Sequence, residues 1–234
     1  MRVADSSQSL QARISSEGFA VIPGVFPNGE ISELLAVLER SGLPRSRAGM
    51  RHAMRNLNVA ALARDSRLVE LAQEVLGSGA IPFRATLFDK SPTSNWLVVW
   101  HQDTALPLRE RREVPGWGPW SIKDGVNYAH APASALEQIL ALRLHLDDSV
   151  AENGPLRVLS GTHTRGVLSD DDLHQLSTRI KPIDCLALRG GILAMRPLVV
   201  HASSKSQSNA PRRVLHIEYA ASLSIAEGLE LATA

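Results

Sequence analysis

The feature that most constrains the fold is a series of short apolar runs after Pro82, each with the length and composition of a β-strand. Turn-forming sequences separate the runs, which are FRATLFDK, WLVVWHQD, ILALRLHLDD, PLRVLSGTH, CLALRG, GILAMRPLVVHAS and RRVLHIEYA. Strands in series without alternating helices are typical of a sandwich or barrel rather than a doubly wound sheet. We therefore predict a mainly β fold whose core spans residues 81–221.

Residues 1–80 have the spacing of helices, interrupted by one strand over residues 19–26. In the segment 28–42, Ile31, Leu35 and Leu38 recur at helical intervals, and Gly42 marks the end. Similar patterns predict helices over 5–18 and 65–77. Because no linker or repeat interrupts the chain, we predict one domain over 1–234, with helical support over residues 1–80 packed on the outside of the β core.

Composition excludes several classes of partner. The formal net charge is +1, so no strong field points to nucleic acid or to an anionic membrane. Cys185 is the only cysteine, and no apolar run approaches the roughly 18 residues of a membrane span. We infer a soluble, cytoplasmic protein that binds a small molecule; the sequence does not indicate its oligomeric state. Arginines cluster at 45–55 and 109–112, either as a solvated face or as a rim that attracts an anionic substrate.

Residues 104–135 interrupt the strand series. The segment is rich in proline and glycine, so we predict a long loop without regular structure that overhangs the site as a lid. With the 43–58 segment it would form the substrate pocket. The candidate pocket residues are Trp117, Trp120, His130, His145 and Arg51.

Two apolar runs end in histidine. His101 begins an H-x-D pair with Asp103, and residues two apart on a strand point to the same side. His201 ends a second run about a hundred residues later. Two histidines and one carboxylate leave metal positions open, which suits non-haem Fe(II) binding a co-substrate and dioxygen together. The alternative is a pair of unrelated buried histidines and a surface aspartate.

The residues after His201 add a site for a carboxylate. Ser203 shares a strand face with His201, and Arg212 begins the next strand. A co-substrate such as 2-oxoglutarate chelates iron through its keto acid end, and its distal carboxylate then needs a fixed cation such as an arginine.

These motifs resemble the phytanoyl-CoA dioxygenase family of Fe(II)/2-oxoglutarate-dependent oxygenases. The resemblance covers roughly residues 80–221 and rests on WHQD (100–103), LHLDDSVAENGPLRVLSGTHTRG (144–166), GGILAMRPLVVHASS (190–204) and APRRVLHIEYA (210–220). It implies a double-stranded β-helix (a cupin-like jelly roll) that uses Fe(II), 2-oxoglutarate and O2. It also implies His101, Asp103 and His201 as iron ligands, with Arg212 and Ser203 on the distal carboxylate of 2-oxoglutarate.

Other cations near this motif need separate treatment. The family commonly has an aromatic residue where Arg143 or Leu144 stands, so Arg143 is a candidate second cation for 2-oxoglutarate or substrate. Lys90 ends a strand predicted to neighbour the strand of His101, and it is either exposed or paired with the C1 carboxylate of 2-oxoglutarate. Strand alternation alone puts Arg213 on the more apolar face, but the family spacing favours Arg212 as the anchor.

The function predicted from these residues is a dioxygenase that hydroxylates a small organic molecule while 2-oxoglutarate is decarboxylated to succinate. Asp103 argues against halogenation, because a halogenase of this kind lacks the carboxylate ligand. Two alternatives remain. One is a cupin-like hydrolase or isomerase with Zn²⁺ or Mn²⁺ on the same three ligands, and the other is a non-catalytic small-molecule binder.

Overall fold

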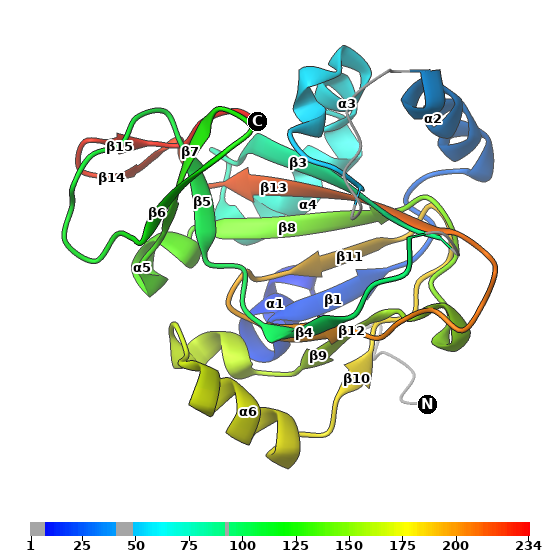
Figure 1. Ribbon diagram of the computed structural model, residues 1–234. Helices are drawn as coiled ribbons and strands as arrows, with labels where there is room; N and C mark the ends of the chain where they lie inside the picture. Colours follow the sequence, from blue (N-terminus) through cyan, green and yellow to red (C-terminus); the bar gives the residue numbers. More distant parts are fainter. Residues whose placement is uncertain (1–7, 41–48, 92–93) are drawn as a thin grey trace.

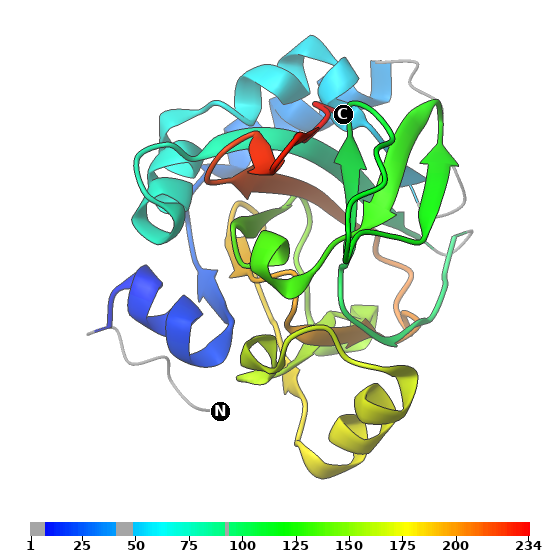
Figure 2. The ribbon, with the colours of Figure 1, turned by 90° about the vertical axis from the view of Figure 1, so that its left-hand side faces the viewer.

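The computed structural model describes residues 8–40, 49–91 and 94–234, and its centre is formed by two antiparallel β-sheets that face each other (Figures 1 and 2). The larger sheet has the strand order β1 (Phe19–Ile22), β11 (Ile192–Met195), β8 (Ile139–His145), β13 (Arg212–Ala220), β3 (Ile81–Lys90) and β2 (Gly49–Met50). The smaller sheet has the order β10 (Ile183–Asp184), β9 (Leu156–Leu159), β12 (Val200–Ser203) and β4 (Val98–His101). The predicted double-stranded β-helix is confirmed.

Helices from the N-terminal region cover the outer face of the larger sheet, as predicted (Figure 1). The N-terminal helices are α1 (Leu10–Glu17), α2 (Asn28–Arg40), α3 (Leu57–Leu62) and α4 (Ser66–Leu76), with the 3-10 helix η1 (Ala53–Arg55). Later in the chain come the helices α5 (Ala133–Leu136) and α6 (Asp170–Arg179) and the 3-10 helices η2 (Ala151–Asn153) and η3 (Thr162–Arg165). Ser9 caps the start of α1, and Gly18 ends it with a φ of 84° that favours glycine. Residues 5–7 and 41–42 of the predicted helices lie outside the described residues.

The larger sheet is buried on both faces, and this places the site. Its outer face packs on the helices through Leu142, Leu215, Ile217 and other apolar side chains. Its inner face, at alternate positions of the same strands, presents buried polar groups to the space between the sheets. These inward residues are Arg84, Lys90, Arg143, His145, Arg212, His216 and Glu218. The interior of the barrel is therefore polar at the end where chemistry is expected.

The prediction of an irregular segment over 104–135 is wrong. It contains the three-stranded sheet β5-β7-β6, formed by β5 (Ala105–Leu108), β6 (Trp120–Lys123) and β7 (Val126–His130), at one end of the barrel (Figure 2). Asp124 and Gly125 have φ values of 49° and 81° and close a two-residue hairpin between β6 and β7. An Asp-Gly pair favours this turn, so the sequence did contain the signal. A further hairpin, β14 (Ser224–Ala226) and β15 (Leu229–Glu230), lies near the C-terminus.

Two other local predictions need correction. The run 191–203 forms two strands, β11 and β12, in different sheets, because the chain turns at Pro197 where a proline cannot donate to a ladder. Between strands of different sheets, Asn153 and Gly154 end η2, with the Asn153 side chain bonded to the backbone of Val150 and Asp148. Residues 185–190 form no strand, apart from an isolated bridge at Ala187.

Helix α6 was not predicted. It buries no residue completely, so its apolar pattern is weak. The signal that could have found it is the capping box of Ser169 and Asp172 at its start.

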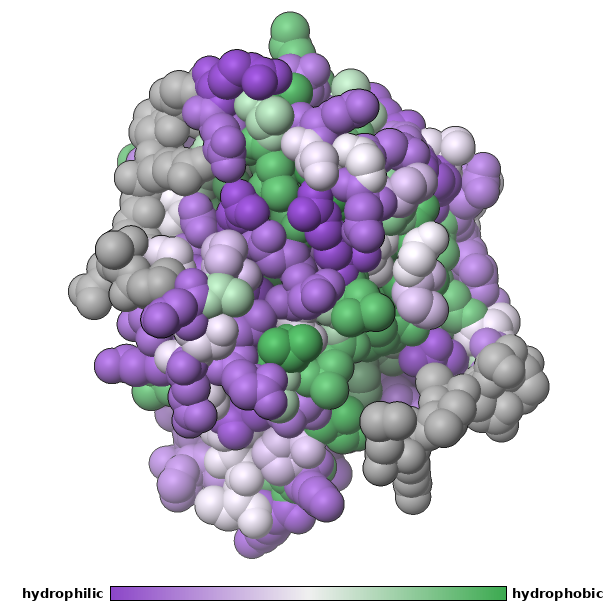
Figure 3. Space-filling model, turned by 90° about the vertical axis from the view of Figure 1, so that its right-hand side faces the viewer, coloured by the Kyte–Doolittle hydropathy of each residue, from purple (hydrophilic) through white to green (hydrophobic). Residues whose placement is uncertain are grey.

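Across the described ranges 8–40, 49–91 and 94–234, every helix is too short or too polar to span a bilayer. One face of the molecule, shown in Figure 3, is largely hydrophilic with a hydrophobic area near its middle.

Candidate active site

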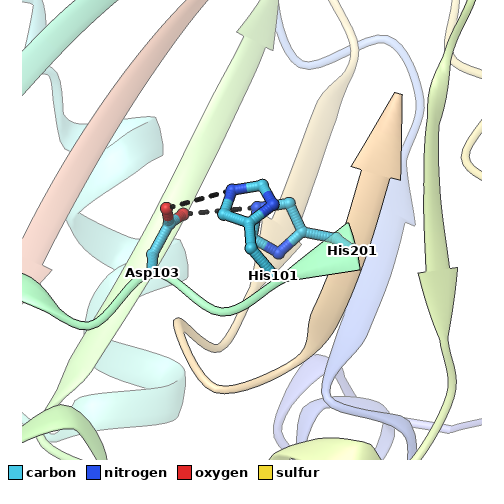
Figure 4. A group of neighbouring side chains, drawn as sticks. All are labelled: His101, Asp103 and His201. Atoms are coloured by element: carbon cyan, nitrogen blue, oxygen red, sulfur yellow. Dashed lines mark ion pairs between the residues drawn. The ribbon is translucent and has the colours of Figure 1, made fainter. Parts of the chain in front are cut away.

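Three potential metal ligands meet between the sheets. His101 ends β4 and is the direct cross-strand partner of His201 on β12, while Asp103 follows two residues after β4. The Asp103 carboxylate lies 3.7 Å from Nε2 of His101 and 3.5 Å from Nε2 of His201 (Figure 4). One ligand atom from each residue lies within 4.8 Å of the other two. The strand pairing therefore brings together three groups that are far apart in the sequence.

Backbone hydrogen bonds orient both imidazoles. Nδ1 of His101 donates to the carbonyl of Val99, and Nδ1 of His201 donates to the carbonyl of Val199, each at 2.9 Å. Because the proton is then on Nδ1, Nε2 keeps its lone pair and faces the aspartate. A metal-binding histidine typically has such a partner on its other ring nitrogen.

The protonation states also suit a metal. Burial lowers the pKa of His201 to about 4, so its imidazole is neutral at neutral pH. Burial alone would raise the pKa of Asp103, but the neighbouring His201 and His101 together with Arg84 hold it below its usual range. Two neutral imidazoles and one ionised carboxylate, with open positions on one side, fit Fe(II).

A second cluster, which we call the cation pocket, consists of Lys90, Ser203 and Arg212. Arg212 and Lys90 are direct partners across β13 and β3. Nζ of Lys90 donates to Oγ of Ser203 at 2.9 Å and to the Ser204 carbonyl at 2.6 Å. Nη2 of Arg212 lies 3.3 Å from the same Ser203 hydroxyl, which donates to the Gly154 carbonyl at 2.9 Å. Two cations thus converge on one hydroxyl.

The cation pocket has no counter-ion of its own among the described residues. Arg212 is 5% and Lys90 1% exposed, and no carboxylate within the described part of the chain pairs with either one. Burial, with Arg212 beside it, lowers the pKa of Lys90 to about 8, and burial with Arg143 nearby lowers that of Arg212 to about 10. Buried cations without a partner are costly, so this pocket favours an anion.

Arg143 connects the two clusters. Its guanidinium is buried and donates to Nδ1 of His216 at 2.8 Å. Its charge acts on Asp103 and His201 on one side and on Arg212 on the other, which places it between the metal ligands and the cation pocket.

Arg213 points the other way. It leaves β13 on the helix-covered face, where its Nε and Nη2 donate to Asp147 at 2.8 and 2.9 Å and its Nη1 to Glu39 at 3.3 Å. An argument from apolar alternation would choose Arg213, because it assumes one buried face. In the structure, the apolar face of β13 packs against the helices, and its polar face lines the site between the sheets.

The predicted pocket residues are only partly brought together. A cavity of about 280 Å³ beside Asp103 includes Arg51 and His130 in its lining. Trp117 and Trp120 instead pack in the apolar cluster under the β5-β7-β6 sheet. His145 lies in the interior near Arg143 and Arg212, with neither ring nitrogen hydrogen-bonded. Residues 43–48 of the predicted 43–58 wall lie outside the described residues.

Sequence reasoning missed several residues that line this cavity. They are Arg84, Thr86, Phe88, Gln102, Thr104, Lys123, Tyr128 and Glu218. Most lie on the inner face of β3 and β13, or on the β6–β7 hairpin within the segment 104–135, for which the sequence predicts an irregular loop.

A double-stranded β-helix whose two histidines and one aspartate can bind a metal and leave its other coordination positions open is typical of the Fe(II)/2-oxoglutarate-dependent oxygenases. Within this class, the chain belongs to the phytanoyl-CoA dioxygenase (PhyH) family, whose model matches residues 14–214. Fe(II) and 2-oxoglutarate are the cofactors of this class, and the three metal ligands that they require are present.

Individual relatives are more distant. The L-proline trans-4-hydroxylase of Streptomyces griseoviridis is 26% identical over 186 residues, which cover 68% of this chain and 62% of the hydroxylase, less than two thirds of its length. EctD from S. alaskensis, solved with 2-oxoglutarate and 5-hydroxyectoine, has a TM-score of 0.69 at 18% identity over 96% of this chain and 80% of EctD. The epimerase SnoN, in complex with Fe3+, alpha ketoglutarate and nogalamycin RO, has a TM-score of 0.68 at 20% identity over 90% of this chain and 82% of SnoN. These likenesses support the fold.

Proposed function

We propose that the protein hydroxylates a small organic molecule with Fe(II), 2-oxoglutarate and O2, and releases succinate and CO2. The observation that carries the proposal is the pairing of the N,N,O ligand set with a cation pocket that has no carboxylate of its own. The name of the proline hydroxylase relative supports hydroxylation as the outcome.

His101, Asp103 and His201 would hold the iron, because their ligand atoms converge and both Nε2 atoms are free of protons. When bound with 2-oxoglutarate, the iron supplies the activation of O2, coupled to decarboxylation of the co-substrate. The protein contributes orientation: the Val99 and Val199 carbonyls fix the rings, and the cross-strand pairing fixes their separation.

Arg212 would anchor the distal carboxylate of 2-oxoglutarate, with Lys90 and Ser203 as further donors. Three groups already converge there, so little rearrangement is needed to receive the anion. Arg143, between this pocket and the ligands, would face the keto acid end. Arg143 or Leu144 stands where the family commonly has an aromatic residue, and of the two Arg143 lies on the polar inner face of β8.

A hydrolase or isomerase using Zn²⁺ or Mn²⁺ could use the same three ligands, but it gives no role to Arg212, Ser203 and Lys90. The discriminating experiment measures succinate formed from 2-oxoglutarate by iron-loaded protein in air. We expect succinate in molar proportion to CO2, dependent on Fe(II) and abolished in His201→Ala. Retention of 2-oxoglutarate without turnover under every substrate tested would favour a binding protein, and lack of 2-oxoglutarate binding would favour a hydrolase.

A further inference from the structure

The cavity beside Asp103 is separate from the cation pocket. Arg51, Lys123, Tyr128 and His130 are among its lining residues, and Lys90, Ser203 and Arg212 are not. The carboxylate of Asp103 forms part of the wall, so a molecule in the cavity lies next to the metal ligands. On the proposed function, this is where the oxidised substrate binds.

The acidic groups of the cavity are already engaged. Asp103 belongs to the metal ligands, and Glu218 accepts two hydrogen bonds from Arg84, one of them at 2.6 Å from Nη2. Nη1 of Arg84 donates to the Ala105 carbonyl at 3.0 Å. The Arg84–Glu218 pair is thus neutralised internally, and neither carboxylate is free for an ammonium group of a substrate.

Two cations of the cavity remain. Within the described part of the chain, the side chains of Arg51 and Lys123 form no ion pair or hydrogen bond. Nζ of Lys123 lies 4.7 Å from the centre of the Tyr128 ring, whose hydroxyl is 3.0 Å from Nε2 of His52. Burial lowers the pKa of Lys123, the neighbouring Arg84 and Arg51 lower it further, and Asp103 acts in the opposite direction.

The segment that precedes Arg51 in the sequence adds positive charge and no negative charge. Residues 41–48 read SGLPRSRA, which contain two arginines and no acidic residue. These eight residues therefore add no carboxylate that could neutralise Arg51.

We propose that Arg51 and Lys123 bind the anionic group of the substrate, and that the substrate is a small organic anion without a compensating ammonium. This inference rests on the proposed function and gives it a substrate class. An arginine and a lysine on one wall suit a carboxylate or a phosphate, and both are strong acceptors for charged donors. The cavity, at about 280 Å³, lies at the small end of the roughly 300–1,000 Å³ typical of ligand pockets. It suits a compact acid.

The test uses one carbon skeleton with four head groups: 4-methylpentanoate, 4-methylpentanamide, leucine and 3-methylbutylphosphonate. Each is titrated calorimetrically into the full-length protein, loaded with Zn²⁺ as a redox-inert ion and saturated with 2-oxoglutarate. The carboxylate, amide and phosphonate are repeated on cyclohexyl and benzyl skeletons, so that one unsuitable shape does not decide the result. The carboxylate and phosphonate arms identify which anion fits.

We expect one of the anions to bind at least about tenfold more tightly than its amide, and 4-methylpentanoate more tightly than leucine. A tenfold change corresponds to about 1.4 kcal/mol, near the low end for a hydrogen bond to a charged group. Lys123→Met and Arg51→Met should each lose about tenfold. Lys181→Met and Arg179→Met, which make the same charge change at the end of α6 and beyond it, should bind as wild type does.

Equal binding of anion and amide would overturn the inference, as would a preference for leucine, unchanged binding in both cavity variants, or absence of saturable binding by every anion. Failure of the proposed function gives a different result. In that case the protein makes no succinate from 2-oxoglutarate, whatever the head-group preference measured by calorimetry. Each variant is first assayed for its own 2-oxoglutarate affinity and unfolding midpoint, so that misfolding is recognised.

Discussion

Replacing Arg212 with alanine should weaken 2-oxoglutarate binding strongly, while the neighbouring Arg213→Ala should not. Arg212 is 5% exposed, and among the described residues its side chain has only the Asn153 carbonyl and the Ser203 hydroxyl as partners, so a bound carboxylate would supply the counter-ion that these residues do not. Arg213 leaves the same strand on the opposite face and pairs with Asp147. The two variants therefore make the same chemical change on two sides of one strand.

The magnitude follows from the burial of Arg212. Removing one partner of a desolvated charge pair typically costs on the order of 2–5 kcal/mol. Lys90 remains beside the carboxylate, so the low end applies, and about 2 kcal/mol corresponds to a dissociation constant raised roughly thirty-fold. Iron binding should persist in both variants, because neither guanidinium is a ligand.

The assay is an anaerobic titration of 2-oxoglutarate into iron-loaded protein. A large loss in Arg213→Ala with Arg212→Ala near wild type would reverse the facing of β13 and refute the reasoning. A small loss in both variants would move the anchor to Lys90 or Arg143.

Three further predictions concern protonation and motion. The pKa of Lys90 is about 8, and the 2-oxoglutarate anion needs the ammonium form of this side chain. The affinity for 2-oxoglutarate should therefore be constant below pH 8 and fall as the pH rises to 9. The variant Lys90→Met should bind 2-oxoglutarate more weakly and lose this pH dependence. Burial and the nearby Arg143 and Arg212 lower the pKa of His145 to about 3, below its unfolded value of about 6.5, so the unfolded chain binds the extra proton in between. The metal-free protein should therefore lose roughly 2 kcal/mol of stability through this group between pH 7 and pH 5 in urea unfolding, and His145→Gln should show a correspondingly smaller decrease. Hydrogen exchange in Ala105–His130 should slow when 2-oxoglutarate and substrate bind if this segment closes over the site, and unchanged exchange during turnover would remove the lid from the mechanism.

The ligand set could be predicted because its signals are local. His101 and His201 each end an apolar run, and the i, i+2 spacing of His101 and Asp103 puts two donors side by side. The strand series and its turns predict a sandwich or barrel, and the resemblance to the phytanoyl-CoA dioxygenase family implies the double-stranded β-helix. The ligand set and the strand series can both be recognised even when the predicted strand boundaries are wrong by several residues.

The substrate cavity could not be predicted in the same way, because it depends on strand register. Arg84 and Glu218 are 134 residues apart and pair only because β3 and β13 align them as direct neighbours. Lys123 reaches the cavity through the Asp124-Gly125 hairpin, which was hidden in a segment whose proline and glycine content suggested a loop. The composition of a segment does not determine its structure when two residues in it specify a tight turn.

The measurement that tests the central claim most directly is an anaerobic titration of Fe(II) and 2-oxoglutarate followed by visible absorption. A weak charge-transfer band from iron to the keto acid should appear in the wild type with one iron per chain. It should be absent in His101→Ala and in His201→Ala, and intact in His174→Ala, which removes an exposed histidine on α6. Full iron binding and an unchanged band in His101→Ala or His201→Ala would contradict the assignment of the metal centre.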